Sequence, residues 1–343
     1  SSVTNLFDIL IIINSKIRRD IMAYIASDLR YSEMKYNFCG KSGLKLPVVS
    51  LGLWHNFGKL ADYENIKKMC FTAFDNGITH FDLANNYGRP YPGSAEENFG
   101  KVLKEEMSPY RDELIISTKA GYFMWDGPYG DGGSRKYLIA SLDQSLKRMG
   151  LEYVDIFYHH RPDKETPIEE TMLALSQIIK SGKALYAGLS NYNGEQMKKA
   201  SEILDELKCP FVINQNRYSI FDRNIEKNGL LDAAVSCKKG VIVFSPLAQG
   251  LLTNRYISGI PAGSRATQEG SFLNKQDITE DILTKVKALN KIAVSRGETL
   301  AQMALNWVMK DGRITSVLIG ASNPEQIKEN VKIINCSKFD EEE

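Results

Sequence analysis

The chain has 343 residues, of which 43% are hydrophobic and 25% are charged, and its formal net charge is +1. This length and composition provide a full hydrophobic core for one barrel-sized domain. Acidic and basic residues are mixed along the chain, without a basic stripe or a long acidic tract, so we expect no nucleic-acid partner. The five cysteines are widely spaced and form no C-x-x-C pair, which is typical of a reduced cytoplasmic protein, and we assign no metal ligands.

The first residues include a short apolar run, residues 6–13, which Asp8 interrupts. Eight residues cannot cross a bilayer, and no basic segment precedes them, so we expect no membrane association. We interpret residues 1–21 as a non-native leader, with a signal peptide as the alternative, because Met22 and Met34 are both candidate natural starts. At the other end, residues 339–343 resemble the acidic first turn of a helix, which suggests that a C-terminal helix is truncated.

From residue 49 onward, short apolar runs alternate with amphipathic stretches. The apolar runs are of the buried parallel type, and glycines such as Gly77, Gly150, Gly182 and Gly240 lie where helices should end. This alternation predicts one α/β domain over residues 22–343, a single (β/α)8 TIM barrel. A doubly wound sheet is the alternative, but it would need a glycine-rich turn directly after the first strand, which residues 53–56 do not provide. The predicted strands are 49–53, 80–84, 114–119, 154–160, 184–190, 211–216, 241–245 and 316–320, and the predicted helices are 63–76, 94–107, 136–149, 168–181, 194–207, 225–238 and 300–310.

Two predicted loops are longer than a simple connection requires. Residues 122–135 follow the third strand, and residues 247–274 follow the seventh. Long loops at the carboxyl ends of barrel strands usually shape the site. The glycine-rich part of the first loop, residues 127–133, lacks the spacing of a dinucleotide-binding turn. It is either a flexible surface loop or a lid over the substrate that carries Tyr129 and Arg135.

Polar residues occupy the ends of three successive predicted strands. Asp82 and Tyr87 follow the second strand, Lys119 closes the third, and the pair His159 and His160 closes the fourth. Because the carboxyl ends of parallel barrel strands gather at one mouth, these side chains can meet there. A phenol, an ammonium, an imidazole and a carboxylate at one point are suited to proton transfer. Adjacent strand residues face opposite sides, so one histidine can face the mouth and the other the helices; the pattern does not choose between them.

Several motifs together resemble the aldo-keto reductase superfamily. They are F-D-L-A-N-N-Y-G (81–88), S-T-K-A (117–120), the strand-end histidine and I-G-A-S-N-P-E-Q-I-K-E-N (319–330). The resemblance covers about Met22 to the chain end, and is greatest to the branch with bacterial L-glyceraldehyde 3-phosphate/methylglyoxal reductases and potassium channel β subunits. C-G-K-S-G-L-K-L-P (39–47), L-G-L-W-H-N-F-G (51–58), G-P-Y-G-D-G-G-S-R-K-Y-L (127–138) and S-P-L-A-Q-G-L-L-T (245–253) resemble the bacterial reductases especially.

The resemblance implies NADPH-dependent reduction of a small carbonyl substrate such as methylglyoxal or glyceraldehyde 3-phosphate. Tyr87 would be the general acid, Lys119 and His160 would tune and orient it, and Asp82 would pair with Lys119. The family position just before Arg161 selects His160 over His159. The channel subunits lack a histidine there, so its presence favours an active reductase. One alternative is a redox-sensing subunit that binds NADPH and turns over slowly. A further alternative is a Schiff-base aldolase with Lys119 as the nucleophile. Because the relatives often form ring-like homo-oligomers, we expect a homo-oligomer.

The same resemblance implies a set of residues that bind the cofactor, NADPH/NADP+. Many members carry a lysine near Gly320 and an arginine near Gln326, and neither is present here, so Arg265, Ser322 and backbone groups would have to hold the 2′-phosphate. Phe244 would stack on the nicotinamide, although an ordinary core phenylalanine is the alternative. The substrate would contact Trp54, Tyr129 and Arg135. The complete cofactor set is Trp54, Asp82, Ser190, Asn191, Gln215, Phe244, Ser245, Pro246, Leu247, Gln249, Arg255, Arg265, Gly320, Ser322, Gln326, Glu329 and Asn330.

Overall fold

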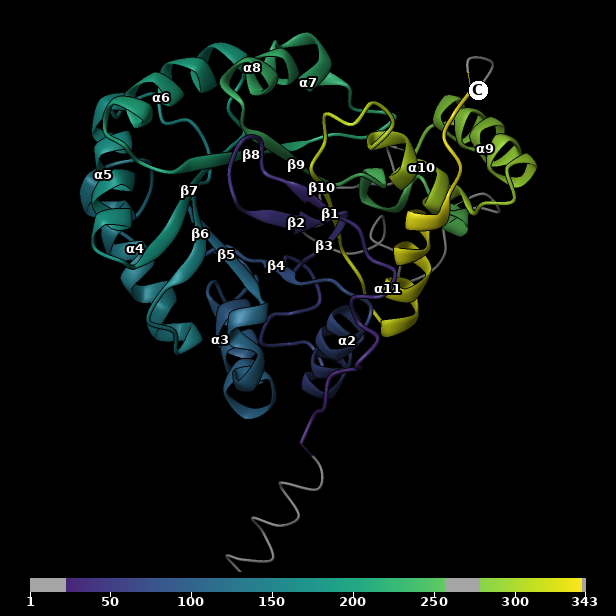
Figure 1. The fold of residues 1–343 in the computed structure, drawn as a ribbon, viewed down its shortest axis with the longest axis horizontal. Helices are drawn as coiled ribbons and strands as arrows, with labels where there is room; N and C mark the ends of the chain where they lie inside the picture. Colours follow the sequence, from purple (N-terminus) through teal and green to yellow (C-terminus); the bar gives the residue numbers. More distant parts are fainter. Residues whose placement is uncertain (1–22, 257–277, 341–343) are drawn as a thin grey trace, which may run out of the picture.

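The computed structural model describes residues 23–256 and 278–340, and its centre is a closed barrel of eight parallel strands (Figure 1). Each strand pairs with its neighbour in the chain, and the last pairs with the first, which confirms the predicted TIM barrel. The strands are buried almost throughout, as their continuous apolar runs predict. They are β3 (Val49–Gly52), β4 (His80–Asp82), β5 (Ile115–Ala120), β6 (Val154–His159), β7 (Ala184–Ser190), β8 (Phe211–Arg217), β9 (Gly240–Phe244) and β10 (Ser316–Ile319).

Helices surround the barrel and cover its outer face (Figure 1). Their starts follow the expected chemistry, because Asn193 and Thr299 each form a capping box with a glutamine three residues on. Gly150 ends its helix in the left-handed conformation, at φ 66°. The helices at predicted positions are α2 (Tyr63–Asp75), α3 (Ser94–Val102), α4 (Arg135–Met149), α5 (Ile168–Lys180), α6 (Gly194–Glu206), α8 (Leu230–Cys237) and α10 (Leu300–Val308). A further helix, α11 (Pro324–Val331), follows β10.

Two predicted helices differ from the structure. The helix predicted over 94–107 becomes a π-helix at Leu103–Met107 and then a 3₁₀ segment, Ser108–Glu113, because Pro109 cannot continue an α-helix. The helix predicted over 225–238 is split into a short α7 (Asn224–Lys227) and α8. Gly229 separates them at φ 76°, and its carbonyl oxygen would lie 2.3 Å from a Cβ at Gly194, so the two chain segments approach closely.

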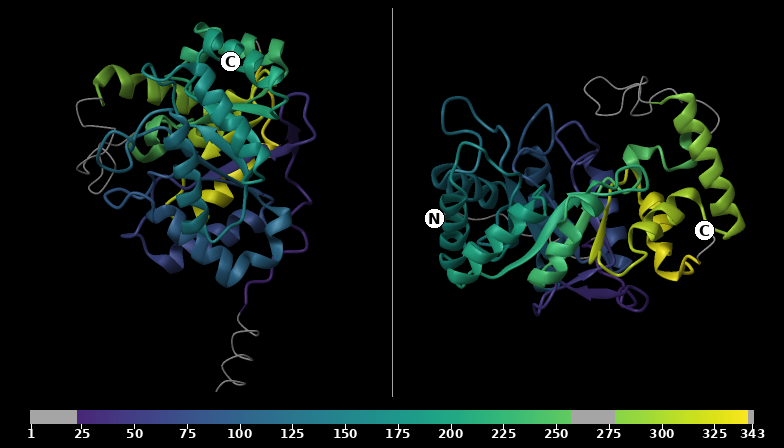
Figure 2. Two further views of the ribbon diagram at one scale, coloured as in Figure 1. Left: turned by 90° about the vertical axis from the view of Figure 1, so that its left-hand side faces the viewer. Right: turned by 90° about the horizontal axis from the view of Figure 1, so that it is seen from above.

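Other elements were not predicted. A hairpin of β1 (Tyr36–Phe38) and β2 (Lys45–Pro47) packs against interior barrel residues and closes the end opposite the mouth (Figure 2). Helix α9 (Glu280–Ser295) begins at the Thr279 cap and packs on α10 at the periphery of the barrel (Figure 2). Residues 336–340 form no regular structure and residues 341–343 lie outside the described part, so the C-terminal helix stays a prediction.

The structure describes the first long loop completely and the second only in part. Residues 122–134 connect β5 to α4 without regular structure. Of the loop after β9, residues 247–256 contain two 3₁₀ turns, η3 (Ala248–Gly250) and η4 (Asn254–Tyr256), and residues 257–274 lie outside the described part. No helix within the described ranges has the length and apolar character to cross a membrane.

Candidate active site

A buried ion pair lies at the centre of the barrel mouth. Asp82 ends β4 and Lys119 is in β5, and Lys119 Nζ lies 2.5 Å from Asp82 Oδ2. Lys119 also donates to the carbonyl oxygen of Leu83 at 2.5 Å. The second carboxylate oxygen, Oδ1, accepts from Ser117 Oγ at 2.7 Å and from Gln215 Nε2 at 3.2 Å. Both charged side chains are almost completely buried. Their ion pair and the additional hydrogen bonds replace the hydration that each charge loses on burial.

Aromatic rings lie around this pair. Lys119 Nζ is 5.0 Å from the ring centre of Tyr87, which is half-buried in the loop after β4. The Tyr87 ring lies 6.1 Å from Trp54 and 6.1 Å, edge to face, from His160. Tyr122 packs edge-on to His160 with ring centres 4.7 Å apart. The predicted residues Asp82, Tyr87, Lys119 and His160 therefore do meet at one mouth.

The structure distinguishes the two adjacent histidines. His160 lies against Tyr87 and Tyr122, in the mouth. His159 points toward the helix layer, where its Nδ1 is 2.7 Å from the hydroxyl of Tyr192. A Cβ added at Gly133 would lie 2.9 Å from His159 Nε2, so the loop before α4 packs directly on this ring. The alternation along β6 thus separates the two rings, and His160 is the one that can reach a ligand in the mouth.

Burial sets the protonation of the cluster. The pKa of Tyr87 is raised well above its ordinary value, chiefly by burial and then by the negative charge of Asp82. The pKa of His160 is lowered well below its ordinary value by burial and by the positive charge of Lys119. Burial also lowers the pKa of Lys119, while Asp82 opposes that change. At neutral pH the phenol therefore retains its proton and the imidazole is uncharged.

The residues proposed for the nicotinamide end adjoin this cluster. Ser190, at the end of β7, and Gln215, in β8, are paired in register and buried. Gln215 contacts Asp82 directly. Asn191 follows at φ 61° and donates from Nδ2 to the carbonyl oxygen of His160 at 2.9 Å. These three amide and hydroxyl side chains therefore lie on the side of the mouth formed by β6, β7 and β8.

The segment proposed for the pyrophosphate has an unusual backbone. Phe244 ends β9 half-buried, and Ser245, Ala248 and Gln249 follow in the left-handed region at φ 53°, 46° and 59°. Such backbone turns orient N–H groups in ways that can contact an anion. Pro246 is buried and Leu247 packs at the edge of the core. Arg255 is exposed in η4, and Arg265 lies outside the described residues.

The segment proposed for the adenosine phosphate begins α11. Ser322 donates to Gln326 Oε1 from its backbone N at 2.8 Å and from Oγ at 3.1 Å, and Asn323 caps the helix. Gly320 is exposed and Asn330 is buried, while Glu329 pairs with Lys332 at 2.5 Å. β10, which leads into this segment, is the barrel neighbour of β9. The two proposed phosphate segments therefore leave adjacent strands.

The proposed substrate residues are not all together. Trp54 is in the mouth beside Tyr87. Tyr129 is 56% exposed beneath Lys136, and Arg135 is exposed at the start of α4. Within the described part of the chain, neither residue forms a hydrogen bond, ion pair or ring contact with Asp82, Tyr87, Lys119 or His160.

Sequence reasoning missed Tyr122, which contacts His160. Tyr137 accepts from Asn85 Nδ2 at 3.1 Å and donates to the Tyr122 carbonyl at 2.5 Å, which fixes that position. The sequence signal for Tyr122 was its position three residues after Lys119, at the carboxyl end of the third predicted strand.

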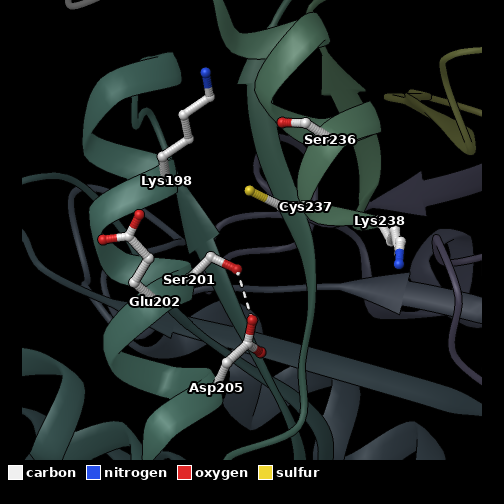
Figure 3. A pocket seen from close by; sticks show the side chains of 7 residues that line it. All are labelled: Lys198, Ser201, Glu202, Asp205, Ser236, Cys237 and Lys238. Carbon is white, nitrogen blue, oxygen red and sulfur yellow. Dashed lines mark hydrogen bonds between the residues drawn. The ribbon is translucent and has the colours of Figure 1, made fainter.

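A hollow lies away from this mouth. It opens between α6 and the end of α8 and is lined mostly by polar side chains (Figure 3). Its only internal bond in the figure joins Ser201 to Asp205 at 3.4 Å. The Lys238 carbonyl accepts from Lys41 of the β1–β2 connection, which places this hollow near the closed end of the barrel. It is lined by Lys198, Ser201, Glu202, Asp205, Ser236, Cys237 and Lys238, none of which belongs to the mouth.

The closed barrel of parallel strands with surrounding helices is the (β/α)8 fold of aldo-keto reductases. Residues 48–343 match the Aldo/keto reductase family. The chain is 57% identical over 325 residues, 94% of each chain, to "L-glyceraldehyde 3-phosphate reductase" of Escherichia coli (strain K12). It is 36% identical over 305 residues, 88% of this chain and 92% of the relative, to "Probable voltage-gated potassium channel subunit beta" of Arabidopsis thaliana. The chain belongs to the aldo/keto reductase family and is an NADP-dependent oxidoreductase.

Proposed function

We propose that this enzyme uses NADPH to reduce small aldehydes to alcohols, with methylglyoxal and triose-type aldehydes such as glyceraldehyde 3-phosphate as preferred substrates. The observation that carries the proposal is the meeting of Tyr87, Lys119, Asp82 and His160 at the mouth. The name of the Escherichia coli relative supports a triose-type substrate. The polar and aromatic mouth suits a short polar carbonyl compound.

In the proposed mechanism Tyr87 is the general acid. Its raised pKa keeps the phenol loaded with a proton at neutral pH, and the Lys119 ammonium 5.0 Å from its ring stabilises the negative charge that develops when the proton leaves. His160, being neutral, can donate one ring N–H to the carbonyl oxygen without bringing a second positive charge beside Lys119. The nicotinamide, when bound, supplies the hydride. The chain supplies orientation and the proton.

The residues of the mouth fit a nicotinamide. His160 Nδ1 is buried without a hydrogen-bond partner among the described residues, so the site contains a polar atom that a ligand can satisfy. Ser190, Asn191 and Gln215 offer hydroxyl and amide groups at the positions proposed for the carboxamide. The half-buried ring of Phe244 at the end of β9 is suited to stacking.

Contacts of Lys119 argue against the Schiff-base alternative. A nucleophilic lysine needs a free, neutral amine, but Nζ donates to both Asp82 Oδ2 and the Leu83 carbonyl oxygen. The place of His160 in the mouth favours turnover over a sensing subunit that only holds the cofactor. Steady-state turnover distinguishes these functions, because cofactor binding alone is common to the reductase and the sensor.

The direct test is oxidation of NADPH by the purified chain, followed at its absorbance maximum, with methylglyoxal, glyceraldehyde and glyceraldehyde 3-phosphate. We expect saturable turnover with a kcat on the order of 1–10³ s⁻¹ for at least one of them. Borohydride trapping without NADPH, read by mass spectrometry, is the control for a Schiff base. A Lys119 adduct without NADPH oxidation would contradict the proposal.

Cofactor choice gives a separate prediction. Arg265, which lies outside the described residues, is proposed to hold the 2′-phosphate because an arginine fork makes two charge-assisted hydrogen bonds. Arg265→Ala should weaken NADPH binding by roughly tenfold to a hundredfold and leave NADH binding nearly unchanged. Fluorescence quenching measures both dissociation constants for the parent chain and for Arg265→Ala. Equal weakening of both cofactors would assign Arg265 to the pyrophosphate instead.

A further inference from the structure

A line of buried polar side chains runs through the barrel interior to Asp82. It begins at Ser316 in β10, whose Oγ is 2.7 Å from Ser50 Oγ in β3. Ser50 Oγ is 2.9 Å from His80 Nδ1 in β4, and His80 Nε2 is 2.9 Å from Ser117 Oγ in β5. Ser117 then donates to Asp82 Oδ1 at 2.7 Å. Every member is at most 2% exposed, so the line is separated from solvent.

The direction of each hydrogen bond follows from counting protons. The Asp82 carboxylate only accepts, so the single Ser117 proton is directed at it. Ser117 must then accept from His80 Nε2–H. Burial lowers the pKa of His80 to about 4, so the ring is neutral and its Nδ1 has no proton. Nδ1 therefore accepts from Ser50, and Ser50 in turn accepts from Ser316.

The line is not a route for protons from solvent. Beyond Ser316, the described residues place only the carbonyl oxygen of Val48 near the line, 3.5 Å from Ser316 Oγ, and a carbonyl has no proton to supply. Because the Ser316 hydroxyl has one proton, the shorter contact with Ser50 at 2.7 Å takes it. Its effect is on orientation, because it holds Asp82 Oδ1 from below and leaves Oδ2 directed at Lys119. No direct hydrogen bond joins His80 to Lys119 within the described residues, so His80 would act through Ser117.

We propose that His80 is a positioning residue of the active site, whose Nε2–H fixes the Ser117 hydroxyl that in turn holds the Asp82 carboxylate toward Lys119. This inference rests on the proposed catalytic role of the Asp82, Lys119 and Tyr87 cluster. His80 would therefore contribute to catalysis by orienting Asp82 through Ser117, without touching the substrate or the cofactor itself.

Two substitutions separate the two hydrogen bonds of the His80 ring, one between Nδ1 and Ser50 and one between Nε2 and Ser117. In His80→Gln the amide nitrogen can reach the former Nε2 position and donate to Ser117, whereas in His80→Asn it can reach only the former Nδ1 position beside Ser50. We expect His80→Asn to lower kcat about tenfold and His80→Gln less than about threefold, since a hydrogen bond that supports a charged group is lost only in the first. KM should change little in both, because neither substitution touches the mouth. Thermal unfolding of both variants checks that they fold.

A purely structural His80 would give equal losses in both variants, or losses in proportion to their lowered Tm, and either result would overturn the inference. A second measurement needs no variant and no activity. The ¹⁵N shifts of His80 in the wild-type chain should show a proton on Nε2 and none on Nδ1; the opposite tautomer would overturn the inference even if the variants do not fold. If the wild-type chain reduces none of the aldehydes, the proposed function is contradicted. The tautomer of His80 would still show whether the hydrogen bonds run from Ser316 toward Asp82.

Discussion

Replacing Tyr87 with phenylalanine should lower kcat for aldehyde reduction by about 10²-fold or more and leave NADPH affinity nearly unchanged. The substitution removes one hydroxyl, which is the proposed proton donor. The ring should keep its place, because its contacts with Trp54 and with the Lys119 ammonium do not need the hydroxyl. Steady-state kinetics and cofactor titration by fluorescence quenching measure the two quantities separately.

The same chain segment offers a control for this substitution. Tyr91 is 45% exposed and its ring lies beside Lys59 rather than in the cluster. Tyr91→Phe removes an equivalent hydroxyl close by in sequence and should leave kcat unchanged. Full activity in Tyr87→Phe, or an equal loss in Tyr91→Phe, would remove the basis for assigning the proton transfer to Tyr87.

The barrel could be predicted because its strands are buried on both faces. Runs such as Val154–His159 are therefore mainly apolar, with the buried Asp155 as an exception, until a polar residue ends them. The hairpin Tyr36–Phe38 and Lys45–Pro47 could not be predicted in this way, since three residues are too few to show a period. The interruption at Gly229 was missed because one glycine inside an apolar helical pattern is compatible with an unbroken helix, and only the close approach of Gly194 explains the break.

The site was predictable to a similar extent. The topology of a parallel barrel brings strand ends together, so Asp82, Lys119 and His160 could be expected at one mouth. The place of Tyr122 could not, because it depends on the path of the following loop, which Arg161 holds through the Gly121 carbonyl at 2.7 Å. The roles of Tyr129 and Arg135 in binding substrate stay predictions, as does a homo-oligomeric state.

Most of the line of polar side chains that leads to Asp82 could not be predicted from the sequence, for a different reason. Ser50, His80 and Ser316 belong to three different strands, and each alone is an ordinary small or polar residue in an apolar run. Their contacts arise from the register of β10 with β3 and of β3 with β4, which a single sequence does not specify residue by residue. The chemistry of the mouth is thus visible at strand ends, whereas its support inside the barrel is visible only in the fold.

Lys119→Met should lower the free energy of unfolding by about 3–5 kcal/mol, because it leaves the Asp82 carboxylate buried without its charge partner. Asp82→Asn should also destabilise, by a smaller amount, since Lys119 keeps the Leu83 carbonyl oxygen as an acceptor. The double variant should be more stable than Lys119→Met alone, because no unpaired charge remains in the barrel. Urea denaturation of the four proteins gives the coupling free energy of the pair.

An exposed pair provides the comparison. Lys285 and Asp281, in α9, lie 2.6 Å apart with side chains 59% and 71% exposed, so solvent screens them. Lys285→Met should change stability little, and its cycle with Asp281→Asn should show almost no coupling. The catalytic consequence differs from the stability consequence, because the double variant at Asp82 and Lys119 lacks the ammonium beside Tyr87 and should be as inactive as Lys119→Met. Recovery of activity together with stability in that double variant would show that the pair only holds the fold, and that the charge of Lys119 does not assist proton transfer.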